Sequence, residues 1–153
     1  MGVRGMSVLA VGLGAAVFFV GPAAAAGGGT GYAGTTSQGW PVAVTVSSSG
    51  KQVVRIGAGL DLKCTSGGFL AEPDYYGRLT IKKTGSFQSH FENQLIDLGG
   101  GRTALLSGDL KGKFNRARTK VSGTWHLSET DRDNLGNPTN QCDSGTVKFS
   151  ATQ

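Results

Sequence analysis

Apolar and polar residues alternate with a period of two along most of this chain. The pattern starts near residue 30 and recurs in segment after segment; in 42–47, for example, Val42, Val44 and Val46 share one face. Such alternation is typical of antiparallel strands that bury one face. The segments that show it are 32–36, 42–47, 54–64, 78–82, 87–92, 104–114, 121–128 and 146–151. We therefore predict about eight strands, and no helix longer than one turn, in this part of the chain.

Short connections join most of these segments. Thr84-Gly85 and residues 115–118 lie where hairpin turns belong, since the apolar sets on either side run in opposite directions. Strands joined to their sequence neighbours form an up-and-down meander, and closing it into a barrel removes the exposed edges. Gly108, Gly112 and Gly123 fall on inward positions, where a missing side chain lets a sheet bend sharply. The expected fold is an all-β antiparallel barrel, with a coiled β-sandwich as the alternative.

The first 26 residues follow a different pattern. Arg4 precedes an apolar run over 8–20, and small residues follow up to an A-x-A exit at Ala24 and Ala26. This layout predicts a secretory signal peptide over residues 1–26. The alternative is a membrane anchor, but a spanning helix needs roughly 20 mainly apolar residues. This run is shorter and is interrupted by glycine.

Removal of the signal peptide from the 153-residue chain leaves about 127 residues, the size of one ordinary domain. Residues 27–31 are rich in glycine, and we expect them to be a flexible lead-in to a single domain over 32–153. The protein is expected to be secreted or held in the cell envelope. We expect no permanent membrane span after cleavage.

The chain has two cysteines, Cys64 and Cys142. In an oxidising compartment, an even pair in a small exported domain is most simply a disulfide. This bond would close a loop of roughly 80 residues, and the chain-entropy model gives a stabilisation of the fold of about 4 kcal/mol for such a loop. The alternative is a thiol nucleophile or a metal site, which no CxxC motif or Cys-His cluster supports. We expect no cofactor.

A series of turn, core and cysteine positions spans nearly the whole mature region. It consists of Gly34-x-Thr36-x-x-Gly39-x-Pro41-Val42-x-Val44-x-Val46, Cys64, Gly85-Ser86-Phe87, Ser107-Gly108, Gly112-x-Phe114, Val121-Ser122-Gly123-Thr124 and Cys142-x-Ser144-Gly145-x-Val147-x-Phe149-x-Ala151. In these positions the chain resembles a group of small secreted bacterial β-barrel domains of uncharacterised function. The layout is also similar in kind to the calycins, lipocalins and avidins, whose own sequence motifs do not occur in this chain. The resemblance implies a fold and a bacterial, exported protein, and it implies no activity.

The two histidines show no catalytic pattern. His90 and His126 fall on the polar, outward faces of their segments. The chain has no G-x-S-x-G elbow and no H-E-x-x-H motif. We interpret both residues as surface histidines.

An acidic cluster precedes a glycine in the long connection expected between 128 and 143. Its members are Glu129, Asp131 and Asp133, and the spacing up to Gly136 is similar to the start of a calcium loop. The third ligand position holds Leu135, and the twelfth holds a cysteine, so the cage is incomplete. We expect a solvated acidic loop and no metal site, and leave weak Ca²⁺ binding open.

Five basic residues gather within ten positions around one expected hairpin: Lys111, Lys113, Arg116, Arg118 and Lys120. The full chain has a net charge of +5, and interspersed acidic residues break up the positive field. One interpretation is a hairpin kept soluble by its charge. The other is a site for an anionic polymer, such as a wall polysaccharide, lipid head groups or DNA. Aromatic residues of the kind that stack bases are sparse here, so we expect no nucleic acid partner.

The aromatic residues fall into two groups. Those expected on inward faces, and hence in the core, are Phe87, Phe91, Phe114, Trp125 and Phe149. Those at a strand start or in the connection expected over 65–75 are Trp40, Phe69, Tyr75 and Tyr76. The second group is a candidate rim for a barrel mouth that contacts a ligand.

Together these observations predict an exported, non-catalytic β-barrel module for recognition or structural support. One alternative is a calyx-type carrier of a small ligand, which needs an interior cavity. Another is a secreted hydrolase, which needs His90 or His126 beside a Ser, Asp or Glu in a cleft. The candidate partners are an anionic envelope polymer and a small apolar ligand.

Overall fold

The computed structural model describes residues 29–71 and 74–153, which form eleven β-strands and no helix. The strands are β1 (Thr30–Thr36), β2 (Pro41–Val46), β3 (Gln52–Ala58), β4 (Leu60–Cys64), β5 (Phe69–Ala71), β6 (Asp74–Thr80), β7 (Ser86–Gly99), β8 (Arg102–Phe114), β9 (Lys120–Arg132), β10 (Pro138–Asp143) and β11 (Val147–Thr152). The prediction of an all-β fold is confirmed. Within the described ranges, no helix has the length and apolar character needed to cross a membrane.

The expected signal peptide, residues 1–26, lies outside the described residues, as do residues 27–28 of the expected lead-in. The end of that lead-in is already part of the fold. Thr30 and Gly31 are the first residues of β1, because they pair with Val46 and Thr45 of β2.

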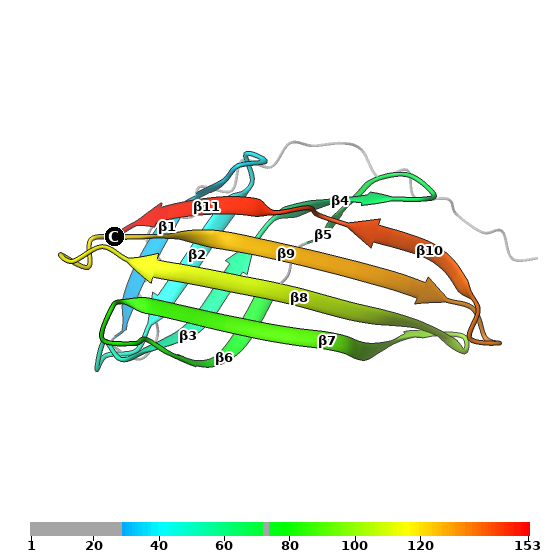
Figure 1. Cartoon of the computed structure of the whole chain (residues 1–153), viewed down its shortest axis with the longest axis horizontal. Coiled ribbons are helices and arrows are strands. Elements are labelled where there is room, and N and C mark those ends of the chain that lie inside the picture. The colour runs from blue at the N-terminus through cyan, green and yellow to red at the C-terminus, as the bar shows by residue number, and fades with distance from the viewer. Residues whose placement is uncertain (1–28, 72–73) are drawn as a thin grey trace, which may run out of the picture.

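The strands form one antiparallel sheet that curls on itself. Eight of them follow one another in the order β7-β8-β9-β11-β1-β2-β3-β6. In Figure 1 the long strands β7, β8 and β9 lie in front, and β1, β2, β3 and β6 cross behind them. Among the described residues β7 pairs only with β8, and β6 only with β3. The barrel expected from the pattern is therefore a half-barrel that stays open between β6 and β7.

A three-stranded branch leaves this half-barrel at β9. One edge of β9 pairs with β8, while its other edge pairs with β11 over 120–125 and with β10 over 128–132. β4 pairs with β10, and β5 pairs with β4. Cys64 and Cys142 face each other across the β4–β10 ladder and form a disulfide with an S–S distance of 2.06 Å. The predicted disulfide is thus confirmed, and it joins β10, the strand next to β9, to β4, the middle strand of the branch.

Two predicted strands have different limits in the structure. The expected strand 54–64 is two strands, β3 and β4, which separate at Gly59 and pair with different neighbours. A bulge beside Val53 puts that side chain in the core, fully buried, where the alternation had placed Val54. The expected strand 87–92 continues to Gly99, because a bulge at Asn93 (φ 52°) shifts the alternation in mid-strand.

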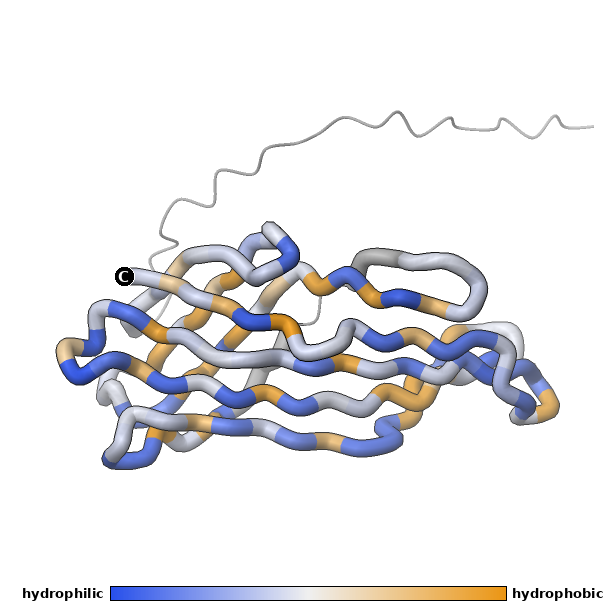
Figure 2. Tube along the Cα trace, turned by 45° about the horizontal axis from the view of Figure 1, so that its top comes forward, coloured by the Kyte–Doolittle hydropathy of each residue, from blue (hydrophilic) through white to orange (hydrophobic). Residues whose placement is uncertain are grey.

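The core fills the concave side of the sheet, and strands coloured by hydropathy alternate between apolar and polar positions (Figure 2). Three phenylalanines each lie opposite a glycine on the neighbouring strand: Phe87 and Gly112, Phe91 and Gly108, Phe149 and Gly123. A Cβ atom on Gly112 would lie 2.2 Å from the Phe87 ring, and one on Gly108 would lie 2.6 Å from the Phe91 ring. The inward glycines therefore make room for aromatic rings.

Candidate functional site

One end of the half-barrel, the left-hand end in Figure 1, is formed by turns that are rich in basic residues. Three turns meet there, over 47–51, 81–85 and 115–119, and backbone hydrogen bonds join them: Ile81 N–H donates to Lys51 O at 2.8 Å, and Phe114 N–H to Gly85 O at 3.0 Å. We call this end the basic pole. Its cations are Lys51, Lys82, Lys83, Lys113, Arg116, Arg118 and Lys120. The segments 47–51, 81–86 and 113–120 contain no acidic residue.

Two of these turns enclose a depression of about 480 Å³, which we call the basic depression. Its lining residues are Lys83, Thr84, Gly85, Lys113, Phe114, Asn115, Arg116 and Arg118. Four of the eight carry a positive charge and none carries a negative one. Within the described ranges none of the four forms an ion pair with a carboxylate. Such a concentration of one sign attracts anions.

The hairpin turn on one side of the basic depression is fixed by hydrogen bonds. Asn115 Oδ1 accepts the backbone N–H groups of Thr119 (2.9 Å) and Lys120 (3.1 Å). Arg118 N–H donates to Asn115 O at 3.0 Å, and the Tyr32 hydroxyl donates to Arg118 O at 2.6 Å. The Arg118 guanidinium carbon lies 5.2 Å from the centre of the Phe114 ring. This contact therefore holds the Arg118 side chain beside Phe114 in the lining of the depression.

The structure separates the five basic residues that the sequence grouped. Lys113, Arg116 and Arg118 line the basic depression, and Lys120 lies at the same pole outside its lining. Lys111 belongs to a different depression, on the outer face of the sheet. Lys83 was missed, because the turn that brings it to the site is about thirty residues away along the chain.

On the outer face, imidazoles and carboxylates alternate in a row across β7, β8, β9 and the end of β10. His90, Asp109 and His126 are direct cross-strand neighbours. His90 Nδ1 lies 2.9 Å from Asp109 Oδ1, and its Nε2 lies 3.2 Å from Glu92 Oε1. His126 Nε2 lies 2.9 Å from Asp143 Oδ2. Sequence reasoning found both histidines but missed the row, because a period of two does not fix the register between strands.

Hydrogen bonds within this row shift two pKa values. The bond and the negative charge of Asp109 raise the pKa of His90 above its usual value. Burial pushes the pKa of Asp143 upward, but the Gly145 N–H and the His126 side chain outweigh it, so that this pKa lies below its usual value.

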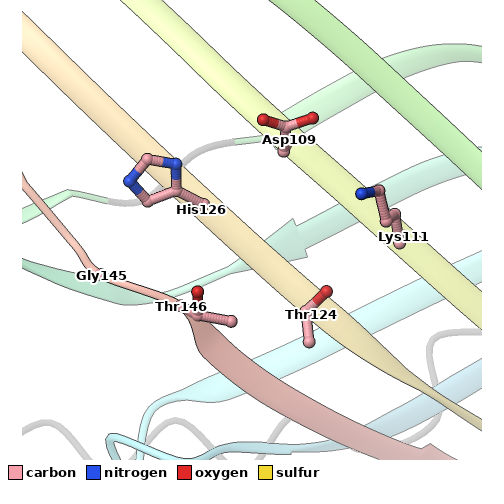
Figure 3. Close-up of a pocket in the computed structure, with 6 residues that line it drawn as sticks. All are labelled: Asp109, Lys111, Thr124, His126, Gly145 and Thr146. Atoms are coloured by element: carbon pink, nitrogen blue, oxygen red, sulfur yellow. The ribbon is translucent and has the colours of Figure 1, made fainter.

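A second depression, of about 360 Å³, lies beside this row (Figure 3). Asp109 and Lys111 rise from β8, Thr124 and His126 from β9, and Gly145 and Thr146 from the segment that enters β11. The lining mixes charges of both signs with hydroxyl groups. In the described part of the chain, no Ser or Thr hydroxyl bonds to either imidazole. Among the residues that the structure describes, neither imidazole is therefore part of a bonded pair of hydroxyl nucleophile and base.

The acidic residues expected in a loop lie mostly in a strand. β9 runs to Arg132, so Glu129 and Asp131 are strand residues and the connecting loop covers only 133–137. Asp133 Oδ1 accepts the N–H groups of Leu135 (2.9 Å) and Asn137 (2.8 Å), and the Asn137 bonds lower the pKa of this carboxyl. Asp133 thus stabilises its own turn. Among the described residues, no group of three or more His, Cys, Asp or Glu side chains is placed to hold a metal ion.

The structure describes the side chain of only one residue of the candidate ligand rim, Trp40. Trp40 packs against Gly59, where an added Cβ atom would lie 2.6 Å from Trp40 Cβ, and its Nε1 donates to Asp61 Oδ1 at 2.9 Å. Trp40 therefore ties the β1–β2 turn to the start of β4. Phe69 belongs to β5, and Tyr75 and Tyr76 to β6, where a loop was expected. The side chains of these three residues lie outside the described part of the structure.

Comparison with protein-family models, curated proteins and solved structures finds no match to this chain. Its function is therefore inferred from the two polar depressions. The outer-face depression mixes charges and defines no ligand class. The basic depression carries charge of one sign only, which attracts anions.

Proposed function

We propose that this protein is an exported, non-catalytic recognition module that binds an anionic polymer of the cell envelope through its basic pole. One observation carries the proposal: four cations from two separate turns line a single depression without any carboxylate. A hairpin that needed charge only for solubility would gain nothing from converging its cations with those of another turn. Convergence is what an anionic ligand requires.

The basic pole also suits a polymer by its extent. Lys51, Lys82 and Lys120 lie around the depression without lining it, so a chain of anionic units seated there meets further cations on either side. Each exposed contact is weak, with a typical value of about 0–1 kcal/mol. Several contacts on one polymer add up through the high local concentration of the linked groups. Such binding weakens steeply as salt is added.

The alternatives receive less support. A calyx-type carrier needs interior space, but Phe87, Phe114, Trp125 and Phe149 are each at most 4 % exposed and belong to one packed core. A hydrolase needs a nucleophile beside its base, and neither His90 nor His126 has a bonded hydroxyl among the described residues. A location outside the cytoplasm is supported by the largely buried disulfide, since such bonds persist in oxidising compartments.

The test is retention on immobilised long-chain polyphosphate and on polygalacturonate in a salt gradient. The pole variant Lys83→Gln/Lys113→Gln/Arg116→Gln removes three exposed charges from the basic depression. The control variant Lys63→Gln/Arg102→Gln/Lys148→Gln removes three exposed charges elsewhere, so the net charge changes equally. We expect the pole variant to elute at clearly lower salt and the control variant to elute close to the parent protein. Equal shifts in both variants, or retention of neither polymer by the parent, would contradict the proposal.

A further inference from the structure

We infer that the basic depression is a subsite for a doubly charged phosphoryl group, a phosphomonoester or a diphosphate, and that Arg118 is its anchoring side chain. This inference rests on the proposed function, because it names the charged group that the same site recognises. Two independent observations carry it. One is the balance of charge in the depression, and the other is the backbone conformation of Arg118.

The charge balance favours a ligand group with more than one negative charge. Lys83, Lys113, Arg116 and Arg118 line one depression, and no carboxylate among the described residues pairs with any of them. Like charges that line one depression repel one another, and a dianion relieves more of that repulsion than a monoanion does. Near neutral pH a phosphomonoester carries close to two charges, whereas a phosphodiester or a sugar carboxylate carries one. A terminal phosphate or a diphosphate therefore matches the depression best.

The backbone at Arg118 points to a role for its side chain. Its φ angle is 58°, in the left-handed region that residues other than glycine and asparagine rarely occupy. The turn imposes this angle through two hydrogen bonds, from Arg118 N–H to Asn115 O and from the Tyr32 hydroxyl to Arg118 O. Glycine would adopt the same conformation without strain. Strained residues of this kind concentrate at functional sites. We therefore assign the guanidinium a function that outweighs the energetic cost of this backbone conformation.

The side chain is also held in a form suited to phosphoryl oxygens. The Arg118 guanidinium lies over the face of Phe114, which is 3 % exposed and packs against Tyr32 at a centroid distance of 5.3 Å. A guanidinium carries its N–H donors in a planar fork that matches two oxygens of one phosphoryl group, and the contact with Phe114 limits where this fork can lie. Lysine would supply the charge without the fork.

The experiment measures binding of inorganic pyrophosphate to the parent and its variants by calorimetric titration. Arg118→Gly keeps the turn conformation and removes the guanidinium, so we expect at least a tenfold loss of affinity, which is what one charged hydrogen bond contributes. We expect its melting temperature to stay within about 3 °C of the parent or to rise. Arg118→Lys should fall between the two. Lys148→Gln removes an exposed charge from β11, outside the basic pole, and should bind nearly as the parent does.

Citrate and dimethyl phosphate complete the design, as an anion of similarly high charge without phosphorus and a phosphate with one charge. We expect pyrophosphate to bind at least tenfold more tightly than either. Equal binding of citrate, or unchanged pyrophosphate binding by Arg118→Gly, overturns the inference while leaving the polymer proposal intact. Failure of both polymers to be retained overturns both. If Arg118→Gly melts more than about 3 °C below the parent, Arg118→Asn, which also tolerates this φ angle, takes its place under the same criteria.

Discussion

Replacement of Gly112 by alanine is expected to destabilise the domain by about 2 kcal/mol, although it adds a single methyl group. The added Cβ atom would lie 2.2, 2.6 and 2.8 Å from three atoms of the Phe87 ring. Carbon atoms in contact are normally 3.5–4.0 Å apart, so the ring must move by about 1 Å or more. Phe87 is 2 % exposed and packs against Phe114 at a centroid distance of 5.6 Å, which leaves the ring little room.

The magnitude follows from two opposing effects. Overpacking of a closed core costs about 1–3 kcal/mol, and a rigid ring belongs near the upper end of that range. Alanine restricts the unfolded chain more than glycine does, and this effect stabilises the folded state by roughly 0.5–1 kcal/mol. The net loss of about 2 kcal/mol corresponds to a fall in melting temperature of roughly 6–12 °C for a domain of this size.

The assay is urea unfolding of the parent, Gly112→Ala, Phe87→Leu and the double variant. With the ring gone, the alanine at 112 should cost less than about 0.5 kcal/mol, so that the two sites are coupled by more than 1 kcal/mol. Gly68→Ala is the control, since its Cβ atom would meet only Leu62 O, at 3.4 Å, and we expect it to be close to neutral. An unchanged cost in the Phe87→Leu background would refute the view that glycine is required here to admit the ring.

Three further predictions concern stability. Replacing Cys64 and Cys142 together by alanine should lower the free energy of unfolding by about 2–4 kcal/mol, measured in urea, and a reductant should then have no further effect. The hydrogen bond to Asp109 raises the pKa of His90, so the pair stabilises the fold fully below about pH 6.5 and loses this effect as the pH rises through the raised value. His90→Gln should flatten that part of the stability–pH curve, and an unchanged curve would contradict the assignment. Burial and then Asp131 raise the pKa of Glu129, so its ionised form is disfavoured in the fold, and Glu129→Gln should raise the melting temperature at pH 8 but not at pH 4.

Much of the fold could be predicted from the chain because burial on one face leaves a direct trace in the sequence. The inward set Val42, Val44 and Val46 is at most 4 % exposed, and the only two cysteines in the chain form the expected bond. The bulge at Asn93 escaped prediction, because one extra residue reverses the alternation and breaks the pattern that marks a strand. The position of β11 between β9 and β1 also escaped, since periodicity says which face is buried and not which strands are neighbours.

In the candidate site, too, only residues that are close along the chain could be grouped from the sequence. Lys113, Arg116 and Arg118 could be grouped because they are close along the chain, and a hairpin keeps such residues together. Lys83 belongs with them only because the turn before β7 folds back beside the β8–β9 hairpin. His90 and Asp109 meet through cross-strand register, which the spacing within one strand does not determine.

The shared strand β9 has a consequence for how the domain unfolds. Its backbone is bonded to β8 along one side and to both β10 and β11 along the other, so the half-barrel and the disulfide-linked branch have this strand in common. Neither region can melt its ladder on β9 without leaving this strand as an unprotected edge of the other region. Two parts that look separable in outline should therefore lose their structure in a single cooperative transition, with the amide protons of β9 among the last to exchange with solvent.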